Sequence, residues 1–132
     1  MFIERLLSGG NGPVIEASVR FAAARHRLLT ENIANVDTPN YIQRDLSPEK
    51  FQALLADRVA ERKSTSGITR FDDLGGEIEN ETSGVLFHDG NNRSMEQLMS
   101  DSAKNALFHN MMLEMLRKQF ATIELALRER VG

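Results

Sequence analysis

Residues 32–41 read NIANVDTPNY, and this stretch decides where a long helix stops and the chain turns. Pro39 has no amide hydrogen, and it disfavours helical geometry at the preceding residue, Thr38. The side chains of Asp37, Thr38 and Asn40 can hydrogen-bond the backbone groups that a helix end leaves unpaired. The stretch therefore predicts a structural corner, and it contains no catalytic pattern.

An apolar stripe leads into this corner. Its positions are separated by alternating steps of four and three, the spacing that keeps one face of a helix toward a partner. The members of the stripe are Ile15, Val19, Ala22, His26, Leu29, Ile33 and Val36. Pro13 suits the first position of a helix, so the pattern predicts a helix over residues 13–35.

The last third of the chain predicts a second, longer helix. Ser94 and Gln97 have the spacing of a capping box, and apolar positions then recur in steps of four and three. That stripe comprises Met95, Met99, Ser102, Ala106, His109, Leu113, Leu116, Phe120, Ile123 and Leu127, and it is widened by Leu98, Phe108, Met112 and Met115. A helix over residues 95–130 would be about 54 Å long at a rise of about 1.5 Å per residue.

The middle of the chain predicts a short helix followed by an irregular segment. The helix should begin at Ser47, with Pro48 and Glu49 in its first turn and one apolar face formed by Phe51, Leu54, Leu55 and Val59. Glycines interrupt residues 62–92, where the pattern allows short strands near 68–71 and 84–88 or a loop. Asp89 and Gly90 are a strong turn signal.

These elements predict a mainly α fold: long N- and C-terminal helices forming a coiled-coil-type bundle, with a short helix and an irregular or small β middle segment. We expect one structural domain built from residues 1–46, 47–93 and 94–132. Periodicity leaves two arrangements open. The long helices could form a hairpin within one subunit, with the surplus apolar surface on the Ser47 helix, or they could also pack against neighbouring subunits.

Composition excludes several classes of function. The net charge of −3 argues against a nucleic-acid-binding surface, and the absence of cysteine excludes disulfides, cysteine metal sites and a thiol nucleophile. No apolar run reaches the roughly 18 residues of a membrane span. The start, MFIERLLSGG, does not have the pattern of a cleavable signal peptide.

The histidines allow two interpretations. His26 and His109 occupy stripe positions on the two long helices, where they could meet as a metal pair or a pH switch. We favour hydrogen-bonded interface residues, because no HxxxH or carboxylate spacing accompanies them. Residues 89–92 lack the alternating ligands of a calcium loop. The sequence therefore predicts no catalytic residues, no metal and no cofactor.

Two motifs resemble those of a known family. The first, Asn32, Ile33, Ala34, Asn35, Thr38, Pro39 and Tyr41, is similar to the N-terminal signature of bacterial flagellar rod, hook and hook-associated axial proteins. The usual form has glycine before the tyrosine, whereas this chain has Asn40, the next most tolerant residue for a positive φ angle. The turn should therefore be retained. The second motif, Asp89, Gly90, Asn91 and Asn92, precedes the long helix and resembles the flagellar basal-body rod proteins, especially the proximal ones.

The resemblance implies a non-enzymatic structural subunit of the proximal rod in the periplasm, exported unprocessed by the flagellum's own type III apparatus. Such subunits assemble by helix packing into the axial drive shaft that transmits torque. The implied partners are further copies, rod proteins of the FlgC, FlgF and FlgG types, the FliE adaptor and the export gate. The resemblance favours stripes that pack between subunits, and the expected interface residues are Ile15, Val19, Ala22, Leu29, Ile33, Met99, Ala106, Leu113, Leu116, Phe120, Ile123 and Leu127.

Two alternatives remain beside this interpretation. A FlgC-type proximal rod paralogue shares the first motif, but the last helix here lacks the RxYxAN-like segment associated with other rod and hook proteins. A helical export adaptor or chaperone, which would form one defined complex with an exported client, is an alternative of a different class.

Overall fold

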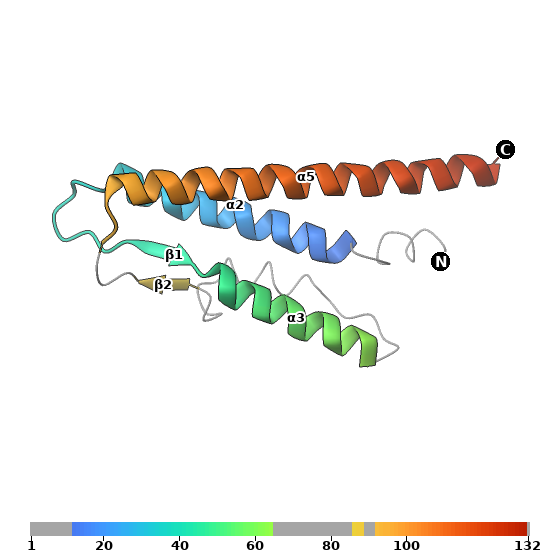
Figure 1. The fold of residues 1–132 in the computed structure, drawn as a ribbon, viewed down its shortest axis with the longest axis horizontal. Coiled ribbons are helices and arrows are strands. Elements are labelled where there is room, and N and C mark those ends of the chain that lie inside the picture. The colour runs from blue at the N-terminus through green and yellow to red at the C-terminus, as the bar shows by residue number, and fades with distance from the viewer. Residues whose placement is uncertain (1–11, 65–85, 89–91, 132) are drawn as a thin grey trace.

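The computed structural model describes residues 12–64, 86–88 and 92–131 of the chain, and these residues are mainly helical (Figure 1). The mainly α fold expected from the sequence is confirmed. The elements in chain order are α2 (Gly12–Ala34), β1 (Arg44–Leu46), α3 (Pro48–Ser64), β2 (Leu86–His88) and α5 (Met95–Val131). The expected strand at 68–71, the expected turn at Asp89 and Gly90, and Asn91 of the second motif lie outside the described residues.

The two long helices lie side by side and run in opposite directions (Figure 1). Helix α2 has 23 residues and α5 has 37, so their lengths are about 35 Å and about 55 Å. Both helices begin and end within a residue or two of the predicted positions. Because α5 is longer, its C-terminal turns extend past the first residue of α2 (Figure 1).

Helix α3 packs against α2 and, with α2 and α5, encloses a cavity. Its first turn is capped as predicted, because the Ser47 hydroxyl accepts a hydrogen bond from the Lys50 amide at 3.3 Å. Phe51 stacks on Phe21 of α2 with ring centroids 4.1 Å apart. Ala17, Phe21, Leu46 and Phe51 form the buried cluster that joins α2, β1 and α3.

Strands β1 and β2 form an antiparallel pair beside the C-terminal half of α2 (Figure 1). Arg44 is opposite His88 and Leu46 is opposite Leu86. The strand at 86–88 is one of the two alternatives that the sequence left open. Strand β1 was not predicted, because three residues reading Arg-Asp-Leu show no alternation of apolar and polar side chains.

The buried side of α5 lies toward one edge of the predicted stripe. Leu98, which was expected to widen the stripe, is buried, and Ser102, Leu113 and Leu116 of the stripe itself are half-buried. Met99 and Ala106 at the other edge are exposed. Asn105, a polar residue that the apolar pattern did not include, is buried because its side chain bonds to α2.

Candidate functional site

The corner between α2 and β1 contains a tight turn at residues 38–41. The Tyr41 amide donates to the Thr38 carbonyl at 3.3 Å, Pro39 occupies the second position and Asn40 the third, with φ of 61°. Proline followed by a residue with positive φ is the pattern of a type II turn. The expectation that Asn40 takes the place of the usual glycine is confirmed.

Asn32 is the buried residue of the first motif, and it holds the start of β1. Its Nδ2 donates to the Arg44 carbonyl at 2.7 Å, and its Oδ1 accepts from the Arg44 amide at 3.1 Å. The Tyr41 hydroxyl donates to the same Oδ1 at 3.4 Å. The carboxamide of Asn32 thus pairs with the backbone of Arg44 much as a neighbouring strand would.

Two further carboxamides bind backbone in the same way. Gln43 donates from Nε2 to the Arg93 carbonyl at 3.0 Å and accepts the Arg93 amide on Oε1 at 2.8 Å. Asn92 accepts the Gln43 amide on Oδ1 at 3.2 Å and donates from Nδ2 to the Tyr41 carbonyl at 2.8 Å. We call Asn32, Gln43 and Asn92 the amide clamps.

The amide clamps link the two motifs. Asn32 belongs to the first motif and Asn92 to the second, and both bind the backbone of the segment 41–44. This segment is too short to satisfy its backbone groups in a sheet, and unpaired backbone groups are costly when buried. The clamps supply the missing partners and tie the corner to the start of α5.

Behind the clamps, Asp45 forms a buried ion cluster. Its side chain is 2% exposed, and Oδ1 accepts from Arg25 Nε at 2.9 Å and from the Leu46 amide at 2.7 Å. Oδ2 accepts from Arg25 Nη2 at 3.1 Å and Arg93 Nη1 at 2.9 Å, and the latter atom also donates to Asp101 at 2.8 Å. The cluster joins α2, β1 and α5.

The ion pairs of this cluster favour the charged form of Arg93. Partial burial opposes the charged form of Arg93, but the hydrogen bonds and charges of Asp45 and Asp101 outweigh burial and raise the pKa of Arg93. A base with a raised pKa stabilises the fold fully below its ordinary pKa and stops doing so only as pH rises through the higher value. Arg93 therefore stays charged across the physiological range.

Asn105 sets the register of the long helices. It is 3% exposed, and its Nδ2 donates to the Ala22 carbonyl at 2.8 Å. A single buried asparagine in a helix pair fixes register at some cost in stability. Because the helices are antiparallel, His26 and His109 lie on opposite sides of this bond, so the structure does not bring them together. No group of three metal-binding side chains occurs among the described residues.

The expected interface residues fall into three groups by exposure. Ile15, Ala22 and Leu29 are buried within the chain, whereas Val19, Ile33, Leu113, Leu116, Ile123 and Leu127 are half-buried. Met99, Ala106 and Phe120 are exposed. The last three lie on one flank of α5 with Met95 and Leu113, and we call these five residues the outer stripe.

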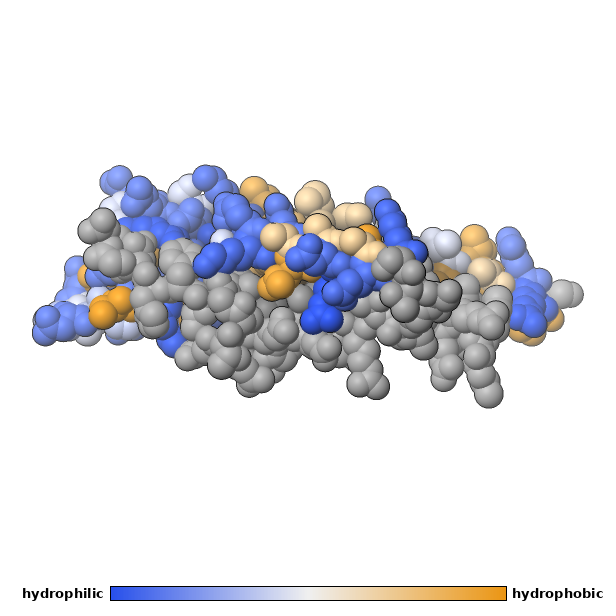
Figure 2. Space-filling model, turned by 90° about the horizontal axis from the view of Figure 1, so that it is seen from below, coloured by the Kyte–Doolittle hydropathy of each residue, from blue (hydrophilic) through white to orange (hydrophobic). Residues whose placement is uncertain are grey.

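The outer stripe repeats about every seven residues, as a coiled-coil seam does. Met99 is 55% and Phe120 is 53% exposed within the chain. Figure 2 views the molecule from the α3 side and shows hydrophobic side chains among hydrophilic ones out to the end of α5. Apolar surface is therefore left uncovered by the described residues.

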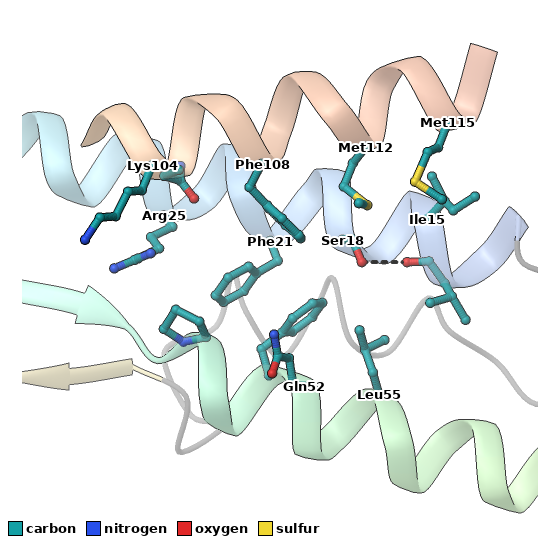
Figure 3. A pocket seen from close by; sticks show the side chains of 14 residues that line it. Ile15, Ser18, Phe21, Arg25, Gln52, Leu55, Lys104, Phe108, Met112 and Met115 are labelled. Carbon is teal, nitrogen blue, oxygen red and sulfur yellow. Dashed lines mark hydrogen bonds between the residues drawn. The ribbon is translucent and has the colours of Figure 1, made fainter. Parts of the chain in front are cut away.

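A cavity of about 610 Å³ lies between α2, α3 and α5 (Figure 3). Phe21, Phe51, Phe108 and Met112 are among its lining residues. Sequence reasoning did not find the cavity, because it depends on the angle between helices. It also missed Arg25, Gln43, Asp45, Arg93 and Asn105; of these, only Asn105 carried a signal, as a polar residue inside an apolar pattern.

The fold and the turn at residues 38–41 define a helical, coiled-coil-type protein whose first motif is similar to the signature of flagellar axial proteins. Comparison with known proteins supports this class. The "Flagellar basal body rod protein FlgB" of Aquifex aeolicus (strain VF5) is 28% identical over 112 residues, which cover 85% of this chain and 88% of that protein. FlgB of Bacillus subtilis (strain 168) is 27% identical over 118 residues, covering 86% and 89%.

No family model matches the chain, and no solved structure matches it. The two relatives nevertheless cover most of the chain and carry the same name. They confirm the resemblance indicated by the two motifs: the chain is similar to the flagellar basal-body rod proteins, of the FlgB type.

Proposed function

We propose that this chain is a structural subunit of the bacterial flagellar basal-body rod, of the proximal FlgB type, and not an enzyme. The observation that carries the proposal is the outer stripe, which presents Met95, Met99 and Phe120 to solvent at coiled-coil spacing. The rod role comes from the names of the two relatives. Packing between subunits would bury the stripe.

The energetics favour burial by a neighbouring helix. Burying a large apolar side chain contributes about 1.5–3 kcal/mol relative to leaving it exposed. The C-terminal turns of α5 extend beyond the first residue of α2, so α2 does not cover them (Figure 1). A contact between two different surfaces can repeat without closing, as a helical rod requires.

The amide clamps and the Asp45 cluster support the mechanical part of the proposal. They fix the angle at which the chain leaves α2 and returns to α5, through directional bonds from Asn32, Gln43 and Asn92. A fixed corner would keep the outer stripe in a constant orientation when the rod turns. We therefore propose that torque passes through the helices, with the corner as a rigid joint.

The remaining parts of the proposal, on location, export and partners, are based on the similarity to flagellar rod proteins. The chain would work in the periplasmic rod after type III export, in one structural domain made of residues 1–46, 47–93 and 94–132. Its partners would be further copies, rod proteins of the FlgC, FlgF and FlgG types, the FliE adaptor and the export gate. No helix in the described part of the chain is long and apolar enough to cross a membrane.

Light scattering across a range of protein concentrations tests the proposal. The chain should form particles that grow with concentration, and Phe120→Glu should prevent this growth because it places a charge in the outer stripe. Ala121→Glu is the matched control, since it adds the same charge at an exposed neighbouring position outside the stripe. Equal assembly of Phe120→Glu and the unchanged protein would refute the assignment.

The same measurement separates the rod subunit from an export adaptor. An adaptor should give one defined complex whose mass does not change with concentration. Growth into extended particles favours the rod subunit.

A further inference from the structure

The cavity between α2, α3 and α5 has the size of a ligand site. Its volume of about 610 Å³ lies within the range of roughly 300–1,000 Å³ that is usual for small-molecule pockets. The stacked rings of Phe21 and Phe51 form part of the wall, and both residues are buried. Because stacking and burial hold both rings in place, this part of the wall should have the same shape with and without an occupant.

The two ends of the cavity differ in character. Figure 3 shows Lys104 and Arg25 at one end, and Ile15, Leu55 and Met115 at the other. No acidic residue is among the lining residues that the structure describes. The cavity therefore offers a cationic end and an apolar end.

Most polar groups of the wall already have partners. The Ser18 hydroxyl donates to the Val14 carbonyl at 2.9 Å, and the Asn105 amide donates to the Ala22 carbonyl. The Arg25 guanidinium is paired with Asp45. Lys104 is exposed and forms no ion pair with any residue in the described parts of the chain, so its ammonium group is the positive charge at this end of the cavity that an occupant can pair with.

The volume limits the shape of that occupant. An α-helix with its side chains is about 10–12 Å wide, so a single turn takes up roughly 400–600 Å³. One turn of a helix would therefore take up most of the cavity volume. A single acyl chain is much narrower and could extend along the whole cavity.

We propose that this cavity binds a single-chain carboxylate amphiphile, a fatty acid, with its carboxylate at Lys104 and its tail against Phe108, Met112 and Met115. The ammonium group and the carboxylate would form a charge-assisted hydrogen bond. The tail would lie along the apolar end, where Met side chains adapt to irregular shapes. This site is separate from the outer stripe and does not depend on the rod function.

Methyl-labelled methionine provides the test, because the methionines in the described part of the chain lie both at the cavity wall and away from it. Decanoate, added to the full chain as a monomer, should shift the methyl signals of Met112 and Met115 in a saturable way. Met95, Met99 and Met111 are exposed and do not line the cavity, so their signals should stay in place. Decyltrimethylammonium, with the same tail and the opposite charge, should bind at least about tenfold more weakly.

Two variants of one residue complete the test. Lys104→Met removes the charge and keeps the length of the side chain, and should weaken decanoate binding about tenfold. Lys104→Glu should reverse the preference toward decyltrimethylammonium. Equal shifts at all methionines, equal binding of the two amphiphiles, or no shift at all would overturn the proposal. Light scattering on the same samples reports assembly separately, so this failure would not affect the proposed rod function.

Discussion

The corner and the distal half of α5 differ in whether their side chains find partners within the chain. At the corner, buried polar groups such as Asn32 and Asp45 have their partners within the chain. Along α5, apolar side chains such as Phe120 and Leu125 remain more than half exposed. Within the described part of the chain, the polar groups of the corner are paired, whereas the far end of α5 keeps apolar side chains exposed.

This difference separates folding from assembly within one chain. Changes at the corner should lower the stability of the single subunit, because they leave buried polar groups without partners. Changes on the outer stripe should leave that stability nearly unchanged and should act only when subunits meet. Substitutions at five positions test this division, in order of their expected effect on stability.

Asp45→Ala should have the largest effect. It removes the shared partner of Arg25 and Arg93, and breaking a buried ion pair in this way costs about 3–5 kcal/mol. Urea unfolding followed by circular dichroism measures the loss. Glu16→Ala is the control, because its pair with Arg20 is exposed and should contribute at most about 0.5 kcal/mol. Similar losses in the two variants would contradict the role of the cluster.

Asn32→Ala should lower the free energy of unfolding by about 1–3 kcal/mol, since Asn32 is buried and its loss leaves the Arg44 backbone groups unpaired. Asn92→Ala should cost less, about 0.5–1.5 kcal/mol, because Asn92 is exposed and water can replace part of its bonding. Both residues bind the segment 41–44, so the double variant should deviate from additivity. Asn110→Ala, at an exposed position of α5, is the control. Strict additivity in urea unfolding would show that the clamps act independently.

Substitutions of Asn40 should change stability less, and they act through the backbone conformation of the turn. Its φ of 61° suits glycine, so Asn40→Gly should change stability by about 0.5 kcal/mol or less. Asn40→Val should cost about 1–2 kcal/mol, because a side chain branched at Cβ is strained at positive φ. Thermal melting of the two variants measures the difference. Equal melting temperatures would mean that the turn has rearranged.

Phe120→Glu should have the smallest effect on the single subunit. At protein concentrations where no particles form, its free energy of unfolding should stay within about 0.5 kcal/mol of the unchanged protein, because the side chain is exposed. Urea unfolding of dilute protein provides the measurement. A large loss of stability would place Phe120 in the fold of the single chain and would undo the contrast with the corner.

The sequence predicted the features that depend on near neighbours along the chain. The capping box at Ser94 and Gln97 is present, with the Gln97 amide donating to Ser94 Oγ at 3.3 Å and the Ser94 amide donating to Gln97 Oε1 at 3.4 Å. The ends of α2 and the positive φ of Asn40 also follow from local rules. Helix caps and tight turns are local, so spacing alone reveals them.

The contacts that build the corner could not be predicted in this way. Gln43 and Arg93 are 50 residues apart, and nothing in the local pattern indicates that one binds the backbone of the other. The burial of Asn105 in α5 was missed because a polar residue does not belong to an apolar pattern. Long-range polar pairing depends on how helices are placed in space, which periodicity does not determine.

The chemistry of the clamps has a consequence for the surroundings in which the chain can work. The carboxamides of Asn32, Gln43 and Asn92 carry no net charge, so acidity and dissolved salt do not alter their hydrogen bonds. Counterions screen charges that are exposed to water much more than buried ones, so the Asp45 cluster is also shielded. The corner should keep its shape as ionic strength varies. Any change with ionic strength should come from the exposed surface of the helices.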